Sequence, residues 1–132
     1  MKRVAVLGAG AWGTAIAVVL SARLEVALFA RDPAQAAALS ATRYNERYLP
    51  GIALPASVAV TSDLAQATRD AALVLAATPV SGLREVLPRV NRPLVWLCKG
   101  FEEGSGLLPH EVAAQTIGRS SPAVIWPALG GA

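Results

Sequence analysis

The fold is decided by the stretch RVAVLGAGAWGTAIAVVLSA at residues 3–22. It opens with a short, mostly apolar run, continues through two glycines around an alanine, and ends in a longer apolar run without a charge. Short apolar runs are typical of buried strands, paired glycines of turns, and longer apolar runs of helices. We therefore predict a strand at residues 3–7, a turn at 8–10 and a helix at 11–22.

The turn carries the pattern G-x-G-x-x-G at residues 8–13. Between a strand and a helix this pattern predicts a dinucleotide site, in which each glycine has a separate role. Gly8 would allow the tight turn, and Gly10 would let a pyrophosphate approach the positive end of the helix. Gly13 would let the helix pack closely on the strand. The alternative is a turn whose glycines serve packing alone.

The N-terminus also has the outline of a targeting segment. Lys2 and Arg3 precede an uncharged stretch at residues 4–22 that ends in small residues, as in a secretory signal or a membrane span. Glycines within it would weaken a continuous apolar helix, so we favour the division into strand, turn and helix.

Composition limits the class of protein. The chain has 132 residues, 54% of them hydrophobic and 16% charged, with a formal net charge of +3, one His and one Cys. This predicts one folded domain and excludes a disordered tail or a disulfide scaffold. The scattered cations do not predict a nucleic-acid surface. One His and one Cys provide no metal-ligand cluster, Cys-His pair or Ser-His-Asp triad.

Strand and helix patterns alternate along the rest of the chain. Residues 43–57 contain prolines and a Pro50-Gly51 turn signal, which predict a loop. Asp32-Pro33 and Ser62-Asp63 are helix-start signals. Strands are predicted at residues 25–29, 58–61, 72–76, 93–98 and 122–126. One helix is predicted to begin at residue 33, and a short one to follow Ser62-Asp63 and end at about residue 68. Two more helices are predicted at residues 80–90 and 107–117. The predicted fold class is α/β: a Rossmann-like, doubly wound, mostly parallel sheet with helices on both faces.

The end of the second predicted strand bears on the choice of cofactor. An acid there binds the ribose 2′-hydroxyl of NAD, whereas an Arg suits the 2′-phosphate of NADP. Ala30 stands where the acid is expected, and Asp32 precedes Pro33 and is expected to cap the helix. Arg31 can then bind the phosphate with its guanidinium, which favours NADP over NAD. The alternative is an Arg31 that only lies on the surface.

Other polar residues follow the later strands. Thr78-Pro79 and Lys99-Gly100 each come just after a buried strand, where ligands of wound sheets bind. The Lys99 ammonium could reach a cofactor or substrate phosphate, or remain a solvated charge. Trp12 either packs on its helix or flanks the nicotinamide. The expected structural residues are Trp96, Cys98 and Trp126 in the core, and His110 on the surface near a helix start.

Five spaced motifs then resemble one family. They are GAGAWGTAIA at 8–17, FARDP at 29–33, R-x-N-x-x-Y-L-P-G-x-x-L-P at 43–55, TPVSGLREVL at 78–87 and CKGFE at 98–102. Together they are similar to bacterial NAD(P)-dependent glycerol-3-phosphate dehydrogenase. The resemblance implies reversible reduction of dihydroxyacetone phosphate to sn-glycerol 3-phosphate with NADP or NAD, in the cytoplasm, supplying glycerophospholipid synthesis. It implies a phosphorylated small substrate, no nucleic acid, no integral membrane segment and a homodimer in the longer protein.

The resemblance also implies roles for single residues. Ala11, Trp12 and Arg31 would line the cofactor, and Lys99 would touch both cofactor and substrate. With the glycine pattern and the strand ends, the predicted cofactor-binding residues are Gly8, Gly10, Ala11, Trp12, Gly13, Arg31, Pro79 and Lys99.

Two features depart from the family pattern. Residues 126–132 read WPALGGA, where the family usually reads like LSGPSFA. Family members also continue into a helical domain that supplies a catalytic lysine acting as general acid and base. We therefore expect residues 1–132 to be the NAD(P)-binding domain, to contain no catalytic residue, and to be inactive alone.

Two other functions stay open at this point. One is another NAD(P)-dependent reductase of the same fold, of the ketopantoate or hydroxyacid type, for which the motif at 43–55 would be unexplained. The other is a nucleotide-binding module without catalysis, since fold does not imply function.

Overall fold

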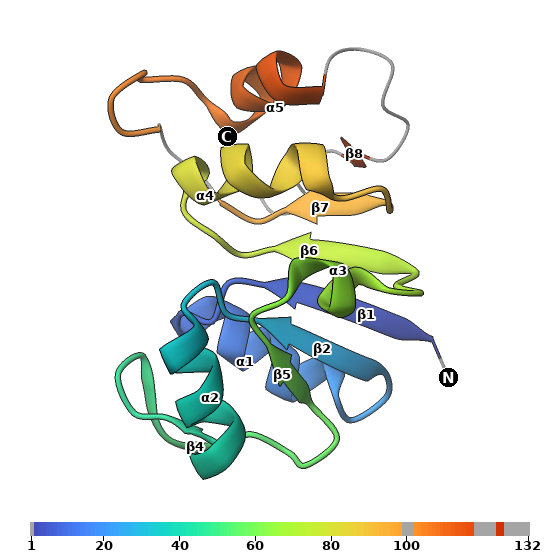
Figure 1. The fold of residues 1–132 in the computed structure, drawn as a ribbon, viewed down its shortest axis with the longest axis vertical. Coiled ribbons are helices and arrows are strands. Elements are labelled where there is room, and N and C mark those ends of the chain that lie inside the picture. The colour runs from blue at the N-terminus through green and yellow to red at the C-terminus, as the bar shows by residue number, and fades with distance from the viewer. Residues whose placement is uncertain (1, 99–101, 118–123, 126–132) are drawn as a thin grey trace.

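A parallel β-sheet forms the centre of the molecule (Figure 1). The computed structural model describes residues 2–98, 102–117 and 124–125. The sheet has the strand order β5-β2-β1-β6-β7-β8, and each neighbouring pair is parallel. Its strands are β1 (Arg3–Leu7), β2 (Glu25–Phe29), β5 (Ala59–Thr61), β6 (Leu73–Ala76), β7 (Leu94–Trp96) and β8 (Val124–Ile125). Because β2 and β6 flank β1 on opposite sides, the direction of winding reverses at β1.

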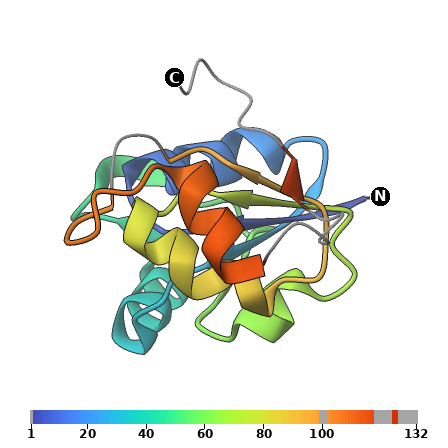
Figure 2. The same cartoon turned by 90° about the horizontal axis from the view of Figure 1, so that it is seen from above.

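Helices cover both faces of this sheet. The first face carries α1 (Ala11–Leu20) and α2 (Pro33–Thr42). The second carries α3 (Leu64–Thr68), α4 (Val80–Val86) and α5 (Pro109–Ile117), with a 3₁₀ turn η1 (Leu87–Arg89) after α4. Figure 2 shows α4 and α5 side by side. The predicted doubly wound α/β fold is confirmed.

Two apolar cores result from the alternation of side chains along the strands. Val6 of β1 belongs to the core that contains Ala17 of α1 and Leu39 of α2. Its neighbour Leu7 belongs to the core that contains Leu83 of α4. All five side chains are at most 2% exposed. The sheet therefore has no solvated face around β1, as its run of apolar residues predicts.

The N-terminal apolar stretch is divided as predicted, into β1, a turn and α1, instead of one continuous helix. Within the described ranges, no helix is long and apolar enough to span a membrane.

The predicted loop at 43–57 is wrong in part, because it contains an antiparallel pair of strands. These are β3 (Tyr44–Asn45) and β4 (Leu49–Ala53), with a register shift between Tyr44 and Asn45. Proline argued against strands here. Each strand of a two-stranded ribbon has an unpaired side, however, so Pro50 is tolerated in β4.

Some element ends also differ from the prediction. The helix expected at 80–90 ends as α helix at Val86 and continues as η1, because Pro88 has no N–H to donate to the carbonyl one turn before it. The strand expected at 93–98 ends at Trp96, so Cys98 lies beyond it and is half-buried. Burial raises the pKa of the Cys98 thiol to about 11. Trp96 is buried and His110 is exposed in the first turn of α5, as predicted, whereas Trp126 lies outside the described residues.

Candidate functional site

The turn between β1 and α1 begins at Gly8, whose backbone is left-handed with φ +106°. Its N–H donates to the Phe29 carbonyl at 2.9 Å. A Cβ at this position would lie 2.8 Å from the carbonyl oxygen of Ala77. Conformation and contact both require glycine here, which agrees with the tight-turn role.

Gly13 has a packing role inside the same turn. A Cβ on Gly13 would lie only 1.7 Å from the Gly8 carbonyl oxygen. The backbone of α1 therefore rests directly on the end of β1, as the glycine pattern predicts.

Gly10 is different, because a Cβ there would meet nothing within 4 Å. Gly10 is the N-cap of α1, its carbonyl accepts from Thr14 N at 3.0 Å, and no side chain caps it in the structure. The first amides of a helix have no acceptor within the helix, and α1 has no acidic residue in its first turn. Free space and uncompensated amides at a positive helix end fit a pyrophosphate.

Asn45 of β3 holds this turn in place, a role that the sequence analysis missed. Its side chain is 4% exposed, and its Nδ2 donates to the Ala9 carbonyl at 2.7 Å and to Thr14 Oγ1 at 2.8 Å. Gln35 Nε2 of α2 donates to the same carbonyl at 3.1 Å. The motif at 43–55 therefore supports the glycine turn. The Asn of that motif was the feature of the sequence that could have indicated this role.

Arg43 fixes the ribbon that carries Asn45. Its Nη2 donates to the carbonyls of Pro55 and Val58, both at 2.6 Å. Its own backbone is left-handed, with φ 64°, and ends α2 by donating to Leu39. The Arg43 side chain thus connects the start of the β3–β4 ribbon to the segment that follows β4.

Arg31 follows β2 at the carboxyl edge of the sheet. Its Nη1 lies 3.5 Å from Glu85 Oε2 of α4, and the two side chains are 78% and 45% exposed. Asp32 caps α2 by accepting from Ala34 N at 3.0 Å, as predicted. Glu85 was not among the predicted site residues, since nothing local in the sequence pairs it with Arg31.

Pro79 lies at the same edge, beyond β6. It is the N-cap of α4, and its carbonyl accepts from Leu83 N at 3.1 Å. The preceding Thr78 contacts the glycine turn, since a Cβ on Gly8 would lie 3.3 Å from Thr78 Cγ2. Thr78 Oγ1 is buried and has no hydrogen-bond partner in the structure. This oxygen faces α4, because a Cβ on Gly82 would lie 3.2 Å from it.

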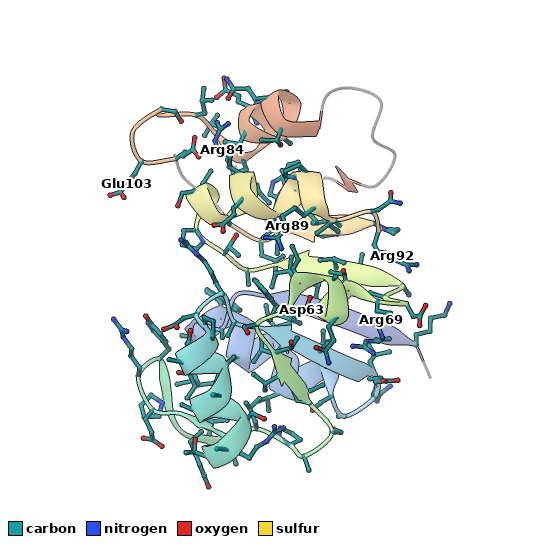
Figure 3. All side chains as sticks on the ribbon, in the orientation of Figure 1. Asp63, Arg69, Arg84, Arg89, Arg92 and Glu103 are labelled. Carbon is teal, nitrogen blue, oxygen red and sulfur yellow. The ribbon has the colours of Figure 1, made fainter. Side chains whose placement is uncertain are left out.

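Lys99 lies outside the described residues, as do residues 100 and 101. Glu102, the next described residue, is 7% exposed. It accepts from Arg84 Nε of α4 at 2.7 Å and from Ser105 Oγ at 2.6 Å. Arg84 lies between α4 and α5, where its Nη2 donates to Gln115 Oε1 at 2.8 Å (Figure 3). The hydrogen bonds from Arg84 and then Ser105 hold the pKa of Glu102 below its usual range.

The turn, Arg31 and Pro79 thus come together around β1, where the winding reverses. Ala11 and Trp12 lie in the first turn of α1, and Trp12 is 73% exposed, so its side chain does not pack on the body of the domain. Ligands of wound sheets bind at this position. Fold and site together define a dinucleotide-binding α/β domain.

The family is shown by sequence comparison. A family model described as "NAD-dependent glycerol-3-phosphate dehydrogenase N-terminus" matches residues 3–128. The chain belongs to this family.

Curated relatives agree with the match. The chain is 50% identical over 121 residues to a glycerol-3-phosphate dehydrogenase [NAD(P)+] of Aromatoleum aromaticum, covering 88% of this chain and 37% of that protein. It is 54% identical over 120 residues to the enzyme of that name from Methylibium petroleiphilum, covering 86% of this chain and 36% of the relative. The chain therefore spans little more than a third of the length of these relatives.

Solved structures show the same fold. A crystal structure of glycerol-3-phosphate dehydrogenase from Coxiella burnetii aligns with a TM-score of 0.80 at 30% identity, covering 95% of this chain and 39% of that one. A probable 2-dehydropantoate 2-reductase from Bacillus subtilis, a class left open by the glycine pattern, aligns with a TM-score of 0.56 at 18% identity, over 74% of this chain and 34% of that one. At that identity the likeness concerns the fold alone.

Proposed function

We propose that this chain is the NAD(P)-binding part of an enzyme that interconverts sn-glycerol 3-phosphate and dihydroxyacetone phosphate. Family membership supports the reaction, and the names of the relatives support the substrates. The observation that carries the cofactor assignment is the open space at Gly10, at the uncapped end of α1. A turn whose glycines served packing alone would have no reason to leave that position open.

The chain's own residues would hold the cofactor in a fixed order. The pyrophosphate would lie on the first amides of α1, with Gly10 leaving room for it and Ala11 and Trp12 beside it. Arg31 would bind at the adenosine end, and Pro79 would flank the cofactor from the β6 side. When bound, the nicotinamide cofactor supplies the hydride for the central carbon of the substrate. Asn45 would keep the turn in its binding shape.

Lys99 is proposed to contact cofactor and substrate phosphate. It lies three residues before Glu102, which Arg84 ties to α4. In the enzyme as it is made from its gene, Lys99→Ala should weaken use of triose phosphate far more than it weakens cofactor binding. Unchanged kinetics in this variant would remove Lys99 from the site.

Catalysis is proposed to need more than these 132 residues. General acid–base help is typically worth about 10² to 10⁴ in rate, and the group that provides it is expected elsewhere in the family's longer chain. We expect no appreciable reduction of dihydroxyacetone phosphate by residues 1–132 alone. Robust turnover by them would overturn this part of the proposal. A cytoplasmic location and a homodimer of the longer protein belong to the same proposal.

The cofactor site is tested by calorimetric titration of NADP and NAD into the wild type, Gly10→Ala and Gly10→Val. Valine should fill the space that the pyrophosphate needs and reduce affinity by about tenfold or more, which is about 1.4 kcal/mol, while alanine should reduce it less. Thermal unfolding provides the control, since a Cβ at Gly10 meets nothing within 4 Å and the fold should persist. Equal affinities in all three proteins would exclude this placement.

A further inference from the structure

One ion pair joins the two halves of the sheet at its carboxyl edge. Among the described residues, Arg3–Glu25 pairs the starts of β1 and β2, and Arg84–Glu102 connects α4 with the chain that precedes α5. Arg31–Glu85 instead connects the segment after β2 with the helix after β6. Because β2 and β6 lie on opposite sides of β1, this pair spans the place where the winding reverses.

The pair places an acidic side chain, Glu85 of α4, at the adenosine end of the proposed site, whereas such an acid is expected at the end of β2. Position 30 is a fully buried alanine, so no carboxylate comes from the end of β2 itself. Asp32 uses its Oδ1 to cap α2. Glu85 of α4 places a carboxylate 3.5 Å from the Arg31 guanidinium, and it is half exposed and so accessible to a ligand.

We propose that Glu85 is a specificity-determining residue, which opposes Arg31 and thereby lowers the preference of the site for NADP over NAD. This rests on the proposed cofactor site. A 2′-phosphate that approaches Arg31 meets the Glu85 carboxylate as well, and like charges repel. NAD carries no phosphate at that position, so it does not meet this repulsion. The pair therefore allows both cofactors to bind, where an unopposed Arg31 would favour NADP more strongly.

The expected size of the effect follows from its exposure. Like charges about 5 Å apart near a solvated surface repel by about 1 kcal/mol, which corresponds to about fivefold in affinity. The ion pair itself contributes little to folding, because Arg31 is mostly exposed and Glu85 about half exposed. Glu85→Gln should thus change cofactor preference without changing stability.

The test is the ratio of the dissociation constants for NAD and NADP, measured by calorimetry on the protein as it is made from its gene. Glu85→Gln should raise this ratio by about three- to tenfold, mainly through tighter NADP binding, and high salt should reduce the change. Arg31→Ala should lower the ratio. In the Arg31→Ala background, Glu85→Gln should have a smaller effect, because Arg31 no longer holds the 2′-phosphate beside Glu85.

Glu25→Gln is the matched control. It removes the same charge at the opposite edge of the sheet, where Glu25 is 57% exposed and lies 3.8 Å from the partly buried Arg3. The inference is overturned if Glu85→Gln changes the NAD to NADP ratio of dissociation constants no more than Glu25→Gln does. It is also overturned if Glu85→Gln changes that ratio equally with and without Arg31. If Gly10→Val binds both cofactors as the wild type does, the proposed site itself fails. If Gly10→Val loses affinity while Glu85→Gln leaves the ratio unchanged, only the role of Glu85 fails.

Discussion

On the α1 side of β1, the groups that directly hold the glycine turn are uncharged. Asn45 donates to Ala9 and Thr14, and Gly13 packs its backbone on Gly8. On the α4 side, the chain at Glu102 is held by two charge-assisted hydrogen bonds from Arg84. Both sides position segments of the proposed site, but they use different chemistry.

The difference indicates how each side responds to its surroundings. Neutral buried hydrogen bonds and close packing do not titrate, so the glycine turn should keep its shape over a wide pH range. An ion pair depends on the charge of both partners, so the Glu102 side should loosen in acid. Within one edge, the cofactor turn is thus the part that is insensitive to pH.

The largest effect is expected from Gly13→Ala on the uncharged side. Its methyl group would overlap the Gly8 carbonyl, with 1.7 Å between the two atoms, so α1 must shift away from β1. We expect a loss of roughly 3 kcal/mol in the free energy of unfolding, measured by urea denaturation. Gly10→Ala in the same turn is the control and should stay within about 1 kcal/mol of wild type. Equal stabilities of the two variants would contradict the packing role of Gly13 and the open space at Gly10.

Asn45→Ala should have the next largest effect. It leaves the Ala9 carbonyl with Gln35 alone and removes the donor to buried Thr14 Oγ1, which should cost about 1 to 3 kcal/mol of stability. Cofactor affinity, titrated where the variant is fully folded, should also fall, because the turn loses its support. Gln35→Ala removes the longer, partly exposed bond to Ala9 and should do less on both measures. Wild-type affinity in folded Asn45→Ala would reduce Asn45 to a structural residue.

The smallest effect concerns the charged side and depends on pH. The pKa of Glu102 is lowered in the folded protein, so the unfolded chain binds more protons in acid, and the stabilisation is complete only above the unfolded pKa of about 4.3. Glu102→Gln should therefore be less stable than wild type near pH 7, and the gap should narrow as the pH falls below about 4. Urea denaturation at several pH values measures this. Glu103→Gln, at the exposed neighbour labelled in Figure 3, removes the same charge and should show no such trend.

Much of the α1 side could be predicted from the sequence, because its signals are local. The bounds predicted for β1 and β2 match the structure, and the Asp32 cap lies next to the Pro33 that signals it. The roles of Gly8 and Gly13 follow from a pattern of six residues in its context. Such features depend on neighbours within a single turn or strand.

The missed features depend on partners that are far apart in the sequence. Asn45 and Thr14 are 31 residues apart, and Arg84 and Glu102 are 18 apart. Neither pair follows from periodicity or capping, since only the fold brings the side chains together. The break at Pro88 was visible in the sequence, but the apolar spacing of residues 83–90 outweighed it in the prediction. The loop was predicted at residues 43–57 because they contain two prolines and the Pro50-Gly51 turn signal, and the pairing of β3 with β4 is not visible in either.

The contact between Asn45 and the glycine turn also links their local unfolding. When the β3–β4 ribbon opens, the Ala9 carbonyl and the Thr14 hydroxyl lose their buried donor at the same moment. Ribbon and turn therefore belong to one cooperative opening unit, although more than 30 residues separate Asn45 from either partner. The fraction of molecules ready to bind a dinucleotide is then set by how often a short surface ribbon detaches, and cofactor binding should in turn slow amide hydrogen exchange in that ribbon.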